Sequence, residues 1–136
     1  LSVLTTLVTE LERLAGVKGH PGILALATTA ASEQEARFLA ASLQMLARLN
    51  VTGVPLTALL ARKTVVGVAR DGALVLPAPL DYLSWTDQIA RLAARKDLQA
   101  PRRGIWLTGR ISPLAQYGLT GLGWTVHSVP PSAVIW

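Results

Sequence analysis

The C-terminal part of the chain carries a strand–helix–strand pattern, which constrains the fold more than any other feature of the sequence. The apolar run 104–108 predicts a strand, and Ser112-Pro113 combines a helix cap with proline at the first helical position. Gly123 ends that helix, and residues 124–129 predict the last strand. Strand–helix–strand units form parallel pairs with right-handed crossovers. The sequence therefore predicts an α/β fold.

A hairpin and a further helix precede this unit. The apolar runs 64–69 and 73–76 flank Asp71-Gly72, the preferred pair for a tight primed turn. Ser84, with Asp87 in the first helical turn, marks the start of the next helix. We therefore expect a small mixed sheet of about four strands, in which an antiparallel hairpin is followed by parallel strands.

Two helices are expected near the N-terminus. Apolar side chains recur at helical spacing over residues 4–15, and Ser32 and Glu35 form a capping box that opens the second helix. We expect these helices to cover a face of the sheet. The short apolar run 23–27 fits a strand or a helix, and Pro55 is expected to open a short helical turn.

The length of the chain, 136 residues, is typical of one domain, so residues 1–136 are interpreted as a single α/β domain. Because the chain begins with Leu1, we expect a fragment or a processed form of a longer protein. The absence of cysteine excludes disulfides, cysteine zinc sites and a thiol nucleophile. No apolar stretch predicts a membrane span, and the low charged fraction of 15% favours a secreted or periplasmic location.

The helix expected after Ser32 is apolar over most of its circumference. Phe38, Met45 and Leu49 form an apolar face beside the main one. A helix of this kind is buried on two sides, either at the centre of a domain or in an interface. The preferred interpretation is a non-catalytic binding or assembly domain, in which a protein partner or a second copy covers these three side chains.

One alternative is an enzyme or sensor that binds a small anionic ligand. Residues 81–85 and 108–113 each connect a strand to a helix. Free backbone amides and helix N-termini at such turns can bind a phosphate or a carboxylate. If their strands are parallel, both turns lie at the same edge of the sheet. The candidate ligand-binding residues are Asp81, Tyr82, Trp85, Thr108, Gly109, Arg110 and Ser112.

A second alternative is a nucleic-acid-binding module. The net charge is +5, and the excess of basic residues lies in the C-terminal half. Such a module would use Arg95, Arg102, Arg103 and Arg110, and its binding would weaken steeply as salt rises.

Catalytic and metal-binding patterns are weak. His20 and His127 lack a third ligand at a recognisable spacing, so no metal or other cofactor is expected. Ser112, His127 and Asp81 could form a triad on paper, but no nucleophile-elbow motif accompanies them. The sequence therefore indicates no catalytic residue.

Overall fold

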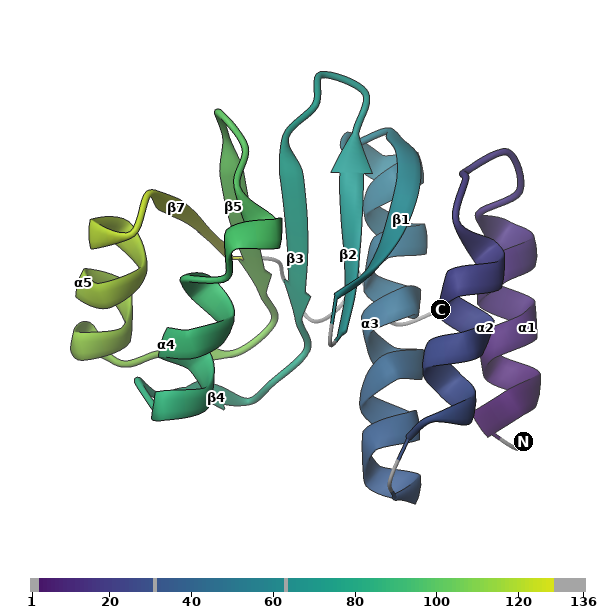
Figure 1. The fold of residues 1–136 in the computed structure, drawn as a ribbon, viewed down its shortest axis with the longest axis horizontal. Coiled ribbons are helices and arrows are strands. Elements are labelled where there is room, and N and C mark those ends of the chain that lie inside the picture. Colours follow the sequence, from purple (N-terminus) through teal and green to yellow (C-terminus); the bar gives the residue numbers. More distant parts are fainter. Residues whose placement is uncertain (1–2, 31, 63, 129–136) are drawn as a thin grey trace.

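The computed structural model describes residues 3–30, 32–62 and 64–128, and it shows a sheet with helices on both faces (Figure 1). The helices are α1 (Val3–Arg13), α2 (His20–Thr28), α3 (Glu33–Thr52), α4 (Asp87–Ala93) and α5 (Pro113–Gly121), with one short 3-10 helix, η1 (Lys96–Leu98). The strands are β1 (Leu56–Arg62), β2 (Thr64–Ala69), β3 (Leu74–Ala78), β4 (Tyr82–Leu83), β5 (Arg103–Leu107), β6 (Arg110–Ile111) and β7 (Trp124–Ser128).

The main sheet has five strands in the order β1-β2-β3-β5-β7, and β4 and β6 form a separate two-stranded ladder. The strands β1, β2 and β3 are antiparallel neighbours, whereas β3, β5 and β7 run parallel. The predicted mixed α/β fold, with a hairpin before parallel strand–helix–strand units, is therefore confirmed.

The strand β1 corrects one expectation. The residues after Pro55 form an extended strand and not a helical turn, and β1 pairs with β2 from Leu56 opposite Ala69 to Arg62 opposite Thr64. Pairing satisfies the backbone of this segment and buries Leu56 and Leu59. Long-range pairing therefore overrides the local helix signal of the proline.

The outer edge of β1 is partly covered by the loop between α1 and α2. The amide of Lys18 donates to the Thr57 carbonyl at 3.0 Å, and the Leu59 amide donates to the Lys18 carbonyl at 2.6 Å. Gly19 follows with a φ of 104°, and a β-carbon at this position would clash with the Leu59 carbonyl. The loop lies this close to β1 because residue 19 has no side chain.

Three predicted helix starts have different outcomes. The Ser32 hydroxyl accepts a hydrogen bond from the Glu35 amide, and the Ser112 hydroxyl accepts one from the Ala115 amide, as expected. Ser84 does not cap α4. Thr86 does so instead, because its hydroxyl accepts from the Ile89 amide one turn into the helix.

The run 23–27, for which the sequence allowed a strand or a helix, lies in α2.

The two faces of the sheet carry two separate cores. The helices α1, α2 and α3 lie on one face, beside β1, β2 and β3, and α4 and α5 lie on the other, toward β7 (Figure 1). Val65 and Val75 belong to the first core, and Val66, Leu76 and Ile105 belong to the second, as the alternation of side chains along a strand requires.

Arg103 lies inside the second core and is only 8% exposed. Its Nη1 donates to the carbonyls of Ala93 and Leu98, at 3.4 and 2.9 Å, and its Nη2 donates to the Leu122 carbonyl. These carbonyls lie at the C-terminal ends of α4, η1 and α5, where a cation is favoured by the helix dipole. The guanidinium also lies 4.8 Å from the ring centroid of Trp124.

Burial lowers the pKa of Arg103. A guanidinium nevertheless stays protonated under ordinary conditions, so the core contains a permanent cation whose hydrogen bonds go to backbone carbonyls. Trp124 binds the same end of α4, since its Nε1 donates to the Ala93 carbonyl at 2.9 Å. One strand-borne cation therefore joins two helices and the 3-10 turn to the sheet.

We expect Arg103→Met to lower the free energy of unfolding by about 3 kcal/mol or more, because several buried carbonyls lose their donor. Arg102→Met is the matched control: this neighbouring side chain is 66% exposed and forms an exposed ion pair, which contributes about 0–1 kcal/mol. Urea unfolding of both variants measures the difference. Equal losses in the two variants would contradict the role assigned to Arg103.

Candidate functional site

The two strand-to-helix turns do lie together at the carboxyl ends of β3 and β5. Tyr82 pairs with Arg110 and Leu83 pairs with Ile111 in the parallel β4–β6 ladder. The Arg110 amide donates to the Asp81 carbonyl and the Ser112 amide to the Leu83 carbonyl, both at 2.9 Å. The geometric expectation that one edge of the sheet carries both turns therefore agrees with the structure.

These contacts occupy the groups that a ligand would need. The amides of Arg110 and Ser112 already donate to the facing turn, and the Ser112 hydroxyl accepts from Ala115. Gly109 has no room for a side chain, because a β-carbon there would clash with the carbonyls of Leu80 and Asp81. The turns are thus joined to each other by backbone hydrogen bonds, which leaves few donors for an anion between them.

The aromatic residues of the first turn point to different environments. Trp85 lies against Gly118 of α5, where any β-carbon would collide with the indole ring. Tyr82 is 55% exposed at the surface, and Thr108 and Gly109 are partly buried beyond the end of β5. Trp85 therefore packs α4 and α5 together and does not form a ligand platform with Asp81 and Tyr82.

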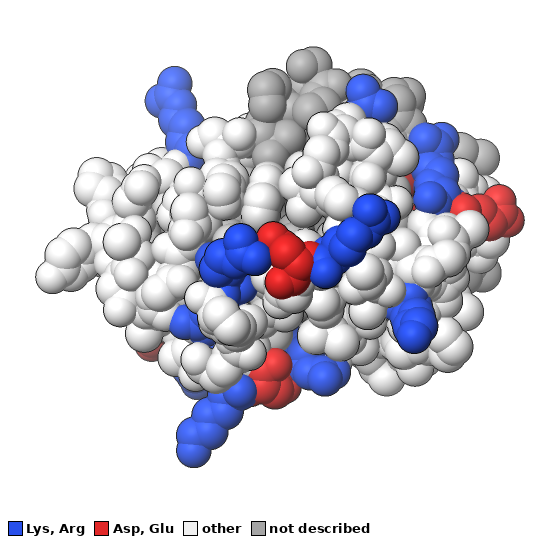
Figure 2. Space-filling view, turned by 90° about the horizontal axis from the view of Figure 1, so that it is seen from above, with Lys and Arg blue, Asp and Glu red and all other residues white. Residues whose placement is uncertain are grey.

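The arginines proposed for nucleic acid do not form one basic surface. Arg103 is buried, Arg102 pairs with Asp71 at 2.9 Å, and Arg95 pairs with Asp97 at 2.8 Å. The hydrogen bond from Arg95 lowers the pKa of Asp97, which keeps that carboxylate ionised beside its partner. Arg110 lies at the opposite end of the parallel strands from Arg102. Figure 2 shows acidic groups placed between basic ones.

The expected interface on α3 also needs correction. Met45 is fully buried and Leu49 is 6% exposed, and both belong to the core that α3 forms with α1 and the sheet. The half-buried Phe38 lines an apolar cavity of about 300 Å³, together with Leu76 and Ile89. Met45 and Leu49 are therefore inaccessible to a partner, whereas Phe38 stays partly exposed beside this cavity.

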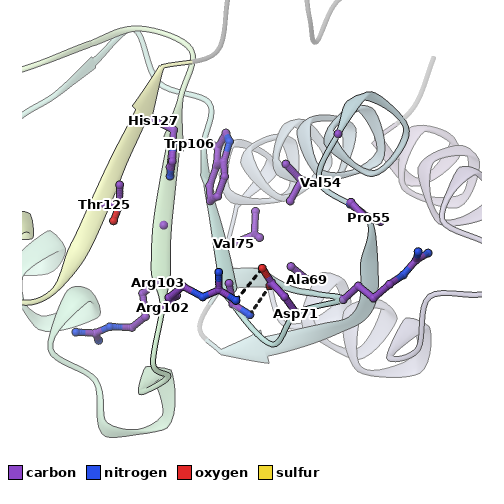
Figure 3. Close-up of a pocket in the computed structure, with 14 residues that line it drawn as sticks. Val54, Pro55, Ala69, Asp71, Val75, Arg102, Arg103, Trp106, Thr125 and His127 are labelled. Carbon is purple, nitrogen blue, oxygen red and sulfur yellow. Dashed lines mark hydrogen bonds and ion pairs between the residues drawn. The ribbon is translucent and has the colours of Figure 1, made fainter.

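A cleft of about 480 Å³ lies where α3 ends and the sheet continues toward β7 (Figure 3). The residues of β5 and β7 that line it are Arg103, at its border, and Gly104, Trp106, Thr125 and His127. The opposite wall includes Val54 and Pro55. On this face of the sheet no described helix covers β5 and β7, because α3 contacts β2 and β3 instead. The cleft therefore exposes part of a sheet face that would otherwise belong to a core.

Trp106 and His127 form the centre of this cleft. Their rings stack with centroids 4.2 Å apart and an interplanar angle of 17°, and Figure 3 shows them side by side. Gly104 makes this arrangement possible, since a β-carbon there would collide with the Trp106 ring. At the amino ends of the strands, Arg102 and Asp71 form the ion pair that borders the cleft.

The strand β7 forms the edge of the sheet beside this cleft. In the described part of the chain it pairs with β5 on one side and with no strand on the other. Neither β7 nor α5, which contacts it, contains Asp, Glu, Lys or Arg. The α5 and β7 end of the molecule, on the left in Figure 2, is accordingly largely white.

No group of three or more His, Cys, Asp or Glu residues within 3–30, 32–62 and 64–128 is arranged to hold a metal ion. None of the helices in the same ranges combines the length and hydropathy that crossing a bilayer requires. No protein-family model, curated protein or solved structure matches the chain. Function is therefore inferred from the geometry of the molecule.

The cleft was not predicted from the sequence, although a signal for it exists. Along β7, the apolar Trp124 and Val126 alternate with the polar Thr125 and His127, which is the pattern of a strand with one face open. Trp106 alone gives no such signal, because tryptophan is usually buried in a core. Only the strand order places Trp106 next to His127 on the uncovered face.

We expect Gly109→Ala to destabilise the fold by about 2 kcal/mol, because the new methyl group must separate the backbones of the two turns. Gly121→Ala provides the control, since no atom lies within 4 Å of a β-carbon at that helical position. That variant should gain up to about 1 kcal/mol. Thermal unfolding compares the two, and an unchanged midpoint for Gly109→Ala would contradict the close approach of the turns.

Proposed function

We propose that this chain is a non-catalytic binding or assembly domain that receives an extended protein segment along the free edge of β7. The observation that carries this proposal is the lack of any charged side chain on an edge strand that is unpaired among the described residues. An edge strand offers a row of backbone donors and acceptors to another chain. Natural proteins usually protect such edges with charge, proline, bulges or a covering loop.

The opposite edge of the same sheet supports this interpretation. There, Lys18 pairs with β1 through its backbone and places a charged side chain at the edge. The ladder between β1 and β2 also contains an irregularity near Leu56 and Ala58. Among the described residues, the β1 edge is partly covered and carries a charge, whereas the β7 edge carries neither, which is the asymmetry expected if β7 is the edge that binds.

The cleft supplies side-chain contacts for a strand added at β7. Added strands gain affinity from main-chain hydrogen bonds and specificity from pockets that receive alternate side chains. Thr125 and His127 lie on the cleft side of β7, with Trp106 behind them on β5. An aromatic or aliphatic side chain of the bound segment would lie against the Trp106 and His127 rings.

A displayed library of random extended peptides tests this function. We expect selected peptides to change the amide resonances of β7 and the indole resonance of Trp106, with little change at residues 81–85 and 108–112. Thr125→Lys should weaken the binding at least 10-fold, which corresponds to about 1.4 kcal/mol. Thr57→Lys, at an exposed position on the opposite edge, should leave it unchanged.

Changes confined to the strand-to-helix turns would contradict this proposal and favour a ligand site there. Equal weakening by Thr57→Lys and Thr125→Lys would also contradict it, because the effect would then follow net charge and not position.

A further inference from the structure

We infer that the segment bound at β7 is β7 of a second copy of this chain, so that two sheets join into one across a two-fold axis. This inference rests on the proposed use of the β7 edge. Two copies of one strand related by a two-fold axis in this way run antiparallel, and their outer backbone groups can form a ladder.

The distribution of charge selects a second copy as the partner. In a two-fold interface each residue near the axis lies close to its own copy, so any charge there meets a like charge. The chain carries a net charge of +5, yet residues 111–136 contain no Asp, Glu, Lys or Arg. The α5 and β7 end of this basic molecule can thus approach its own copy without like-charge repulsion.

The surface next to β7 supplies area that the strand alone lacks. A strand of 5 residues is short, and a stable interface buries about 800 Å² on each partner. The neighbouring helix α5 exposes Leu114 and Tyr117 to 61% and 79%. Tyrosine is enriched in protein interfaces because its large ring loses little conformational freedom on burial.

The most complete pairing places the two-fold axis at Val126, the central residue of β7. In this register Val126 faces its own copy, and Thr125 faces His127 of the second copy. Thr125 and His127 both lie on the cleft side of the sheet, so this pair extends the polar and aromatic surface of the cleft across the axis. All residues of β7 then have a partner, which no shifted register provides.

Sedimentation equilibrium of the 136-residue chain tests the inference. We expect a mass of twice 14.4 kDa at micromolar concentrations, with little dependence on salt because no ion pair forms across the axis. Thr125→Lys and Tyr117→Glu should each raise the dimer dissociation constant at least 10-fold. The controls Thr57→Lys and Val51→Glu should leave it unchanged, although Val51 is also an exposed apolar residue, at 70%.

Cross-linking tests the register. Because the chain contains no cysteine, Val126→Cys introduces a single thiol that should form an intermolecular disulfide on oxidation, whereas Thr57→Cys should not. Equal cross-linking of both variants would overturn the register.

A monomer at all concentrations up to about 100 µM would overturn self-association. If selected peptides still bind β7 in that monomer, the proposed function stands with another chain as partner. If neither a second copy nor a peptide binds β7, both proposals fail. A dimer that dissociates with Val51→Glu and persists with Thr125→Lys would place the interface elsewhere and overturn the inference.

Discussion

The buried guanidinium of Arg103 is the interaction on which the C-terminal half of the structure depends. Removing this cation from water is unfavourable, but three helical segments end around it, and their last carbonyl oxygens have no partner within the helix. Hydrogen bonds to these carbonyls offset the loss of hydration. The segments α4, η1 and α5 are short, and such helices are marginal without tertiary contacts. Arg103 thus provides a tertiary contact that stabilises all three segments, which are too short to be stable separately.

The sequence predicted the parallel part of the fold well because its signals are local and mutually consistent. Ser112 and Pro113 start α5, and the predicted hairpin is present around Asp71-Gly72. Its turn is one residue longer than the tight primed turn expected, since the Ala69 amide donates to the Ala73 carbonyl across the three residues between them. The strand β1 was predicted as a helical turn, because the sequence of this segment does not show that it pairs with β2. The capping role of Thr86 was assigned to Ser84, since both residues are good caps and only the structure shows which hydroxyl reaches the Ile89 amide.

The candidate site was less predictable for a related physical reason. The meeting of the turns at residues 81–85 and 108–112 followed from parallel strands, but their mutual hydrogen bonds depend on how closely Gly109 allows them to approach. Arg103 illustrates the same limit. Its position next to Arg102 suggests a basic surface, yet alternation along β5 sends the two side chains to different environments, one buried and one exposed.

The loop at Lys18 also bears on how far such sheets can grow. A sheet that can add strands at both of its edges allows molecules to join without limit into fibres. A sheet that can add a strand at one edge only stops growing after two molecules have paired. Within the described residues, Lys18 already occupies part of the outer side of β1. For a pair joined through β7, as inferred above, loss of that cover through a substitution of Gly19 that displaces the loop would open a second edge and allow further copies to add.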